Sequence, residues 1–264
     1  MRTSNPALND DVFRESAGAY GQSTTMTLQG TVMKTGVLLC LLVAAAGYTW
    51  AQTQALTTTA QTAEAADPAA RLAVPSNAYT FMLIGSIGGF LVSMITIMKP
   101  RVSPYSAPLY AILEGLALGG ISTIFEYRFH GIVLEAVELT FGTLAALLLA
   151  YSSGLIKATE NFKLGIVAAT GGICLVYLAS FVLGFFGISI PLIHTSSPVG
   201  IGFSAFVVVI AALNLVLDFD FIENGVRQGA PKYMEWYGGF GLLVTLVWLY
   251  LEILRLLSKL RSRD

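Results

Sequence analysis

Five acidic residues stand within or at the edges of long apolar runs, where an ionisable side chain is costly and is by default a candidate for function. We expect Asp218 and Asp220 to lie near the inner face of a membrane and Glu114 near its middle. Glu138 and Glu252 would then lie toward the outer face. Carboxylate oxygens suit Ca²⁺, and acidic side chains along a pore select cations. The spacing therefore predicts a cation path through a membrane.

The densest acidic feature is the segment Leu217–Glu223, at the end of an apolar run. Within a helix, Asp218 and Asp220 would point to different sides. The next basic residue along the chain is Arg227, so neither acid has an adjacent base. We interpret the two aspartates as candidate metal ligands and as a candidate pH sensor. The alternative is an interfacial cluster that marks where the helix leaves the membrane.

The other acids have simpler interpretations as well. Arg255 follows Glu252 by three residues, on the same helical face, so a local ion pair is the alternative to a functional role for Glu252. Glu114 has no basic neighbour in sequence; it is protonated, paired across helices, or exposed to a wet cavity. Glu138 stands deeper in its run than Glu135, and its role is open between interface and path.

The amino-acid composition indicates what kind of protein positions these acidic side chains. Of the 264 residues, 55% are hydrophobic and only 12% charged, and the mean hydropathy is +0.71, whereas soluble chains carry about a quarter charged residues. A net charge of −1 gives no reason to expect a nucleic-acid partner. Walker, His-Glu-x-x-His, Cys-x-x-Cys and Gly-x-Ser-x-Gly motifs are missing. We therefore expect a membrane protein that is not an enzyme and has no cofactor.

Seven apolar runs have about the 20 residues needed to cross a bilayer, and they predict an all-α integral membrane bundle of seven transmembrane helices. We expect a flexible tail over residues 1–28, the transmembrane domain over 29–258, and a basic tail over 259–264. The polar stretch Ala51–Asn77 is predicted to be a loop outside the membrane. The runs are Gly30–Trp50, Ala78–Met98, Ala107–Phe125, Ile132–Tyr151, Leu164–Phe186, Val199–Leu217 and Tyr237–Leu257.

Basic residues predict the orientation, because Lys and Arg favour the cytoplasmic side. With the amino terminus inside, the three inner loops hold Lys99 with Arg101, Lys157 with Lys163, and Arg227 with Lys232. The outer loops hold fewer bases, although the basic carboxyl tail then falls outside and breaks the rule. We expect the amino terminus in the cytoplasm, so that cysteines placed at Ser76 and Ser103 would be accessible from opposite sides.

Three segments carry a resemblance to a known family. They are Ala107–Ser122 around Glu114, Leu217–Glu223, and Leu246–Leu257 with its Tyr-Leu-Glu-Ile-Leu-Arg-Leu-Leu ending. From about Met26 onward the chain resembles the bacterial branch of the Bax-inhibitor-motif membrane proteins. The resemblance implies a bacterial cytoplasmic membrane and a seven-helix fold whose last helix is central, wrapped by the other six. It also implies a Ca²⁺ leak gated by pH through two aspartates on the last two helices.

Carried onto this sequence, the first aspartate of that pair matches Asp220 best, with Asp218 as the alternative. The second position falls on Glu252 or on Thr245, depending on which part of the motif is matched, and Glu235 or Glu114 could substitute. The resemblance thus implies a pH-sensitive cation channel whose flux changes between about pH 6 and 8. The alternative is a regulatory membrane protein that binds other membrane proteins or proteases and transports nothing. The oligomeric state is open.

Overall fold

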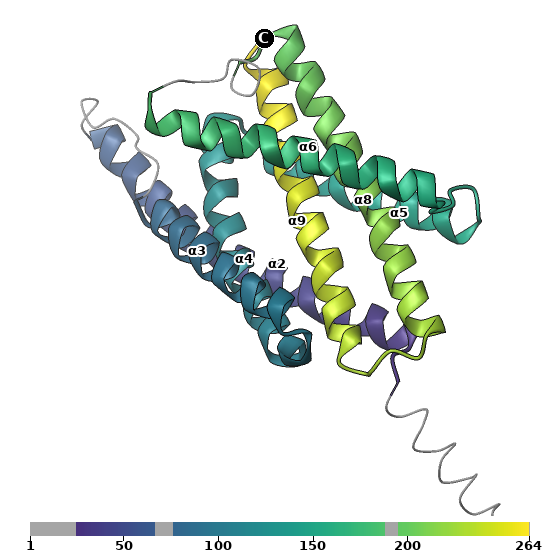
Figure 1. Cartoon of the computed structure of the whole chain (residues 1–264). Coiled ribbons are helices and arrows are strands. Elements are labelled where there is room, and N and C mark those ends of the chain that lie inside the picture. Colours follow the sequence, from purple (N-terminus) through teal and green to yellow (C-terminus); the bar gives the residue numbers. More distant parts are fainter. Residues whose placement is uncertain (1–24, 67–75, 188–194, 264) are drawn as a thin grey trace, which may run out of the picture.

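The bundle is built from long apolar helices. The computed structural model describes residues 25–66, 76–187 and 195–263, and within them seven helices are long and apolar enough to cross a membrane. The helices pack into one bundle (Figure 1). The predicted fold class, an all-α bundle of seven transmembrane helices, is confirmed. The first 24 residues of the predicted tail lie outside the described residues.

The connections between the helices lie where the apolar runs of the sequence are interrupted. A short 3₁₀ turn, η1, spans Pro100–Val102 and joins α3 to α4, and Gly131 adopts a φ of 80° directly before α5. The long helices are α2 (Leu28–Ala66), α3 (Ser76–Met98), α4 (Ser103–Arg128), α5 (Ile132–Ser152), α6 (Glu160–Phe185), α8 (Pro198–Arg227) and α9 (Met234–Arg261).

Helix α2 runs well past its predicted end. The loop predicted from Ala51 is wrong over residues 51–66, because the helix continues to Ala66. The candidate membrane span within it is Leu28–Thr53. The extension is rich in Ala, the best helix former, although Thr, a weaker one, is nearly as frequent. Polar residues end an apolar run, but they do not end a helix.

Helix α8 likewise continues ten residues beyond its predicted end at Leu217, to Arg227. Its end is a Schellman motif, in which Ala230 N–H donates to Gly225 O at 2.9 Å and Gly229 N–H to Val226 O at 3.1 Å. Gly229 has a φ of 65°, a conformation that glycine adopts without strain. The segment with the two aspartates therefore lies inside the helix and not at its end.

Helix α9 is the centre of the bundle (Figure 1), as predicted. It packs against α2, α4, α5 and α8, and Leu243, Leu249 and Leu254 are completely buried along it. Of the other two helices, α3 packs mainly against α4, and α6 packs against α8. Four helices thus pack closely along the last one, and α6 reaches it through the side chain of Tyr177.

Glycines set the close contacts of α4 with α2 and α3. A Cβ atom on Gly119 would lie 2.7 Å from the carbonyl oxygen of Ala46 on α2. A Cβ atom on Gly85 of α3 would lie 2.5 Å from the amide nitrogen of Ala117. Small residues let membrane helices approach this closely. The three helices α2, α3 and α4 thus form a tightly packed layer beside α9.

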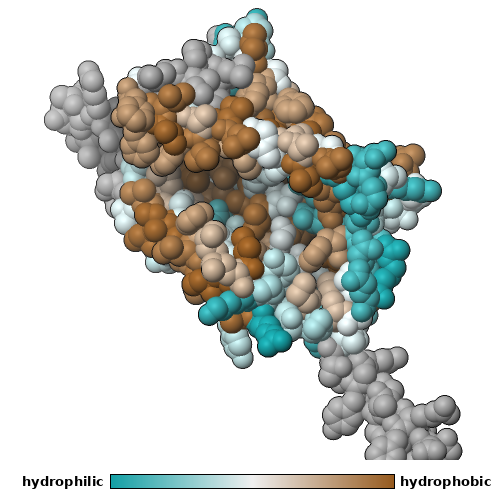
Figure 2. Space-filling model, in the orientation of Figure 1, coloured by the Kyte–Doolittle hydropathy of each residue, from teal (hydrophilic) through white to brown (hydrophobic). Residues whose placement is uncertain are grey.

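The outer surface of the bundle is largely apolar. Figure 2 shows hydrophobic side chains over much of the face formed by α3 and α6, with hydrophilic groups gathered toward the ends. Ile87 and Phe90 of α3 and Leu175 and Phe181 of α6 are all more than 60% exposed. Such a surface suits contact with lipid chains, and it confirms an integral membrane protein with several spans.

Candidate functional site

Asp218 lies inside the bundle, where α8 meets α9. Its Oδ2 atom is shielded from solvent and has no hydrogen-bond partner among the described residues. The side chain of Thr245, on α9, lies close to the same carboxyl group, and its hydroxyl group donates to Gly241 O at 3.3 Å. Leu215 and Phe219, which are buried, precede and follow it on α8. An acidic group therefore stands between two helices in apolar surroundings, and in the described part of the chain the hydroxyl group of Thr245 lies opposite it.

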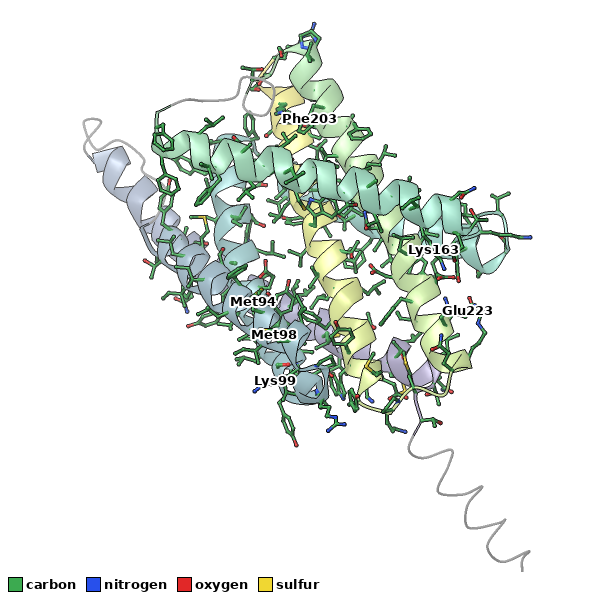
Figure 3. All side chains as sticks on the ribbon, viewed as in Figure 1. Met94, Met98, Lys99, Lys163, Phe203 and Glu223 are labelled. Carbon is green, nitrogen blue, oxygen red and sulfur yellow. The ribbon has the colours of Figure 1, made fainter. Side chains whose placement is uncertain are left out.

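Asp220 faces a different helix. Its Oδ2 atom forms an ion pair with Lys163 Nζ at 2.8 Å and accepts a hydrogen bond from Asn224 at 2.7 Å. Lys163 lies on α6 beside α8 (Figure 3). No base is adjacent to Asp220 along the chain, but the structure supplies one from another helix, Lys163, which belongs to the first turn of α6 and not to the predicted loop. The prediction that the two aspartates point to different sides is confirmed.

This divergence bears on the metal site expected at Asp218 and Asp220. One carboxyl group contacts α9 and the other contacts α6. Among the described residues, no group of three or more acidic, histidine or cysteine side chains could hold a metal ion. The two aspartates do not form a shared cation site in this arrangement.

Glu114 lies at the contact between α4 and α3. It is half-buried, and its Oε2 atom is 2.7 Å from the position that a Cβ atom on Gly89 would take. No described residue forms a hydrogen bond or ion pair with it. The carboxyl group is thus set into the notch left by a glycine of α3, away from the contact between α8 and α9.

Glu138 is exposed on the outer surface of α5. Its neighbour Glu135, one turn earlier, forms an ion pair with Arg261 of α9 at 2.6 Å. The structure therefore does not bring Glu138 together with Asp218 or Glu114. The predicted ladder of acids across the membrane is not assembled as one row, because helix rotation places these side chains on different faces.

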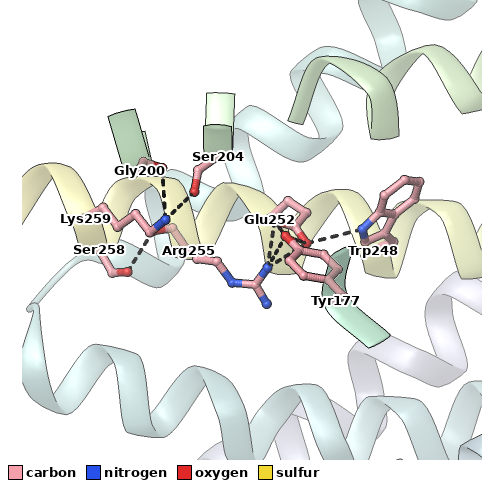
Figure 4. Close-up of polar contacts among 8 residues, drawn as sticks. All are labelled: Tyr177, Gly200, Ser204, Trp248, Glu252, Arg255, Ser258 and Lys259. Atoms are coloured by element: carbon pink, nitrogen blue, oxygen red, sulfur yellow. Dashed lines mark hydrogen bonds and ion pairs between the residues drawn. The ribbon is translucent and has the colours of Figure 1, made fainter. Parts of the chain in front are cut away.

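Glu252 is 2% exposed and is the centre of a polar network on α9 (Figure 4). Arg255 Nη1 lies 2.9 Å and 3.0 Å from its two oxygens. The hydroxyl group of Tyr177 donates to the same carboxylate at 3.0 Å, and the indole N–H of Trp248 at 3.3 Å. The ion pair weighed as the simpler interpretation of Glu252 is confirmed. It ties α9 to α6 through Tyr177.

Glu235 plays the corresponding part at the other end of α9. It is 1% exposed and forms an ion pair with Lys34 of α2. Its Oε1 atom also accepts hydrogen bonds from the Thr27 amide at 2.9 Å and from the Thr27 hydroxyl at 3.0 Å. An anion at a helix amino terminus is favourable. Glu235 therefore fixes the start of α2, and it is not a partner of Asp220.

Two further features were missed from the sequence. Met26 is 3% exposed and Thr27 contacts Glu235, so the end of the predicted flexible tail is packed against the bundle. Lys259, assigned to the basic tail, belongs to α9 and is 6% exposed. Its Nζ atom donates to Gly200 O at 3.0 Å and to Ser204 Oγ at 2.8 Å. Arg255 and Lys259 are four residues apart, one helical turn, and this spacing could have indicated that Lys259 continues the last helix.

Comparison with known proteins gives one match. A family model described as Bax inhibitor 1 like matches residues 5–262. No curated protein matches the chain. No solved structure matches it.

Proposed function

Because the chain belongs to the Bax inhibitor 1 like family, we propose that it is a pH-sensitive cation leak, with Ca²⁺ as its ion, in which the carboxyl group of Asp218 senses pH at the contact between α8 and α9. The proposal keeps the channel activity that the sequence resemblance implies. It moves the sensor from Asp220 to Asp218. The second position of the sensor is then Thr245, one of the two positions that the motif matches, and not Glu252, Glu235 or Glu114.

The buried and unpartnered Oδ2 atom of Asp218 is the observation that carries the proposal. Asp220, Glu235 and Glu252 each have a basic partner that compensates their charge. Asp218 has none among the described residues, and a carboxylate in apolar surroundings without a cation is costly. A change in its protonation therefore alters the contact between α8 and α9 more than a change at a paired acid would.

The two protonation states of Asp218 make different contacts with Thr245. A neutral carboxyl group carries a hydroxyl that donates a hydrogen bond, whereas the ionised group only accepts. In the neutral state, the carboxyl group of Asp218 donates a hydrogen bond to Thr245, and α8 and α9 stay packed together. In the ionised state, the uncompensated charge draws in water and a cation and loosens the contact. Flux is therefore expected to rise as pH rises.

The number of oxygen ligands that Asp218 and Thr245 offer suits the passage of Ca²⁺ better than its tight binding. Ca²⁺ is held tightly by six to eight oxygen atoms, whereas one carboxylate and one hydroxyl offer three at most. Conduction requires binding that is favourable enough to admit the ion and weak enough to release it. Asp218 with Thr245 supports a transient contact with the ion on its way through the bundle.

The test is Ca²⁺ flux into liposomes that contain the reconstituted protein, measured against pH. We expect Asp218→Asn to remove most of the pH dependence, because it keeps the shape and removes the titrating group. Asp220→Asn is the matched control, the same change two residues away on α8, and it should keep the pH dependence.

Two results would contradict this proposal. If Asp220→Asn, and not Asp218→Asn, removes the pH dependence, the sensor is assigned to the wrong aspartate. If the protein gives no more flux than empty liposomes at any pH, the channel reading fails. The regulatory protein that binds other membrane proteins would then take its place.

A further inference from the structure

A cavity of about 980 Å³ opens at the end of the bundle where α9 finishes. It is lined by residues of α3, α4, α6 and α9, and Figure 2 shows the surface hollowed between α3 and α6. Three basic side chains line it, those of Arg128, Arg255 and Lys259, and no acidic side chain does among the described residues. The cavity is therefore a positively charged recess.

Arg255 presents an unused edge to this recess. All of its hydrogen bonds to Glu252 and Tyr177 come from a single nitrogen, Nη1. No described residue accepts a hydrogen bond from its Nε or Nη2 atoms, and its side chain is 38% exposed. The guanidinium group also lies over the Tyr177 ring, 5.0 Å from its centroid, which fixes its plane. A fixed guanidinium edge with two available donors matches the oxygens of a phosphate group.

Lys259 is a buried ammonium group without a carboxylate. It is 6% exposed, and its two hydrogen bonds go to neutral oxygens of α8, Gly200 O and Ser204 Oγ. An ammonium group has three donors, so one remains after these two contacts (Figure 4). A buried charge without an opposite charge is costly. An anion in the cavity would compensate it.

Arg128, at the carboxyl end of α4, adds a third positive charge at the mouth of the cavity. It is exposed, and no described residue forms an ion pair with it. Glu252 pairs with Arg255, whereas no acid in the described part of the chain forms an ion pair with Arg128 or Lys259. The recess thus carries an excess of two positive charges.

We propose that this cavity binds the phosphate group of an anionic membrane lipid. Arg255 would hold two phosphate oxygens through Nε and Nη2, while Lys259 and Arg128 balance the charge. The rest of the lining supports a lipid over a soluble anion, because Phe181 and Phe185 of α6 line the cavity and are 66% and 76% exposed. Acyl chains would extend from the cavity along the apolar surface between α3 and α6. This inference does not depend on ion passage.

The depth of the site agrees with a lipid headgroup. Arg255 stands six residues before the end of α9 at Arg261, which is about 9 Å along a helix. Arg128 is the last residue of α4. The basic groups therefore extend from the end of the helices to just below it, where the phosphates of a bilayer lie.

Native mass spectrometry of the full chain in detergent would test the site, with phosphatidylglycerol, phosphatidylcholine and inorganic phosphate as probes. We expect phosphatidylglycerol to bind in a 1:1 complex, more tightly than phosphatidylcholine. Lys259→Met and Arg128→Gln should each weaken this binding, Lys259→Met by about tenfold or more, as expected for one hydrogen bond to a charged group. Arg263→Gln is the matched control, an exposed base at the same end that does not line the cavity.

The outcomes separate the alternatives. If Lys259→Met does not fold, as judged by its helical circular dichroism, Arg128→Gln carries the test, because it changes an exposed side chain. Equal binding of phosphatidylcholine, or unchanged binding in both variants, would overturn the proposal. Inorganic phosphate that displaces the lipid at similar concentration would also overturn it, because the site would then recognise the anion and not the lipid.

Discussion

Glu235 and Glu252 stand near opposite ends of α9, and both are almost completely buried. Each is paired with a base and accepts further hydrogen bonds, from Thr27 on one side and Tyr177 on the other. A buried carboxylate with a full set of donors stabilises a unique arrangement, whereas the loss of one partner leaves an uncompensated charge. These two acids therefore hold the central helix in place. Asp218 and Glu114 have no basic partner among the described residues, and of these two Asp218 is the one that stands between α8 and α9.

Replacing Glu252 should destabilise the protein strongly. Glu252→Gln leaves Arg255 without its carboxylate, and we expect a loss of about 3 kcal/mol in the free energy of unfolding. Glu160→Gln is the control, because Glu160 is 91% exposed in its pair with Lys163, and exposed pairs contribute about 1 kcal/mol or less. Unfolding of both variants in mixed detergent micelles, followed by circular dichroism, measures the difference. Equal losses would contradict the role of the network.

The pair of Lys34 and Glu235 should show coupling. Lys34→Met leaves a buried carboxylate without its cation, and Glu235→Gln removes the charge from the same contact. We expect the double variant to be more stable than the sum of the two losses predicts, with a coupling energy of about 1–3 kcal/mol. A double-mutant cycle of unfolding measures it. Additive losses would mean that the ion pair does not hold α2 to α9.

At the scale of the elements, glycines decide how closely α4 approaches its neighbours. Gly119 faces α2, where an added Cβ atom would lie 2.6 Å from the Thr49 Cβ atom. Gly142, in the middle of α5, has no neighbouring atom within 4 Å of such a Cβ. The same residue type thus serves a close helix contact in one case and none in the other.

This difference predicts opposite effects for one substitution. Gly142→Ala should leave stability unchanged or raise it by up to about 1 kcal/mol, because alanine is the better helix former. Gly119→Ala should lower it by about 1–3 kcal/mol, the usual range for overpacking, since α2 and α4 must move apart. Thermal unfolding of the two variants checks this. A stabilised Gly119→Ala would show that the contact is looser than the structure indicates.

At the scale of the whole molecule, the basic carboxyl end of α9 has structural partners. Arg261 pairs with Glu135, Arg255 with Glu252, and Lys259 bonds to α8. The positive-inside rule concerns bases that remain in loops beside the spans. Bases engaged in the bundle do not report orientation in the same way, so of the three basic residues of the predicted tail only the exposed Arg263 still counts against this orientation.

The orientation itself is open to a labelling test. Ser103 is unsuitable for it, because the side chain is completely buried and donates a hydrogen bond to Tyr233 O at 2.9 Å. Lys99 and Arg263 are exposed, and they lie at opposite ends of the bundle. In a background without Cys40 and Cys174, Lys99→Cys should react with a membrane-impermeant maleimide only from the cytoplasmic side, and Arg263→Cys only from the other. Labelling of both from one side would contradict the seven spans.

The sequence alone determined the class of the protein and the number of its spans. Hydrophobic runs of about 20 residues report how much of the chain lies in lipid, and this property is local. The ion pair of Glu252 with Arg255 could also be predicted from the sequence, because residues three apart on a helix are always neighbours. The ends of α2 and α8 could not be predicted, since hydropathy reports burial in lipid and not the continuation of backbone hydrogen bonds.

Only the tertiary structure decided which acids stand alone. Lys163 and Asp220 are 57 positions apart along the chain, and Lys34 and Glu235 are 201 apart, so no local pattern links them. Whether a carboxylate meets a base on another helix depends on how each helix is rotated about its axis in the bundle. That rotation follows from packing of side chains across all the helices at once. It left Asp218 of α8 opposite Thr245 and gave Glu235 and Glu252, the two buried acids of α9, their basic partners.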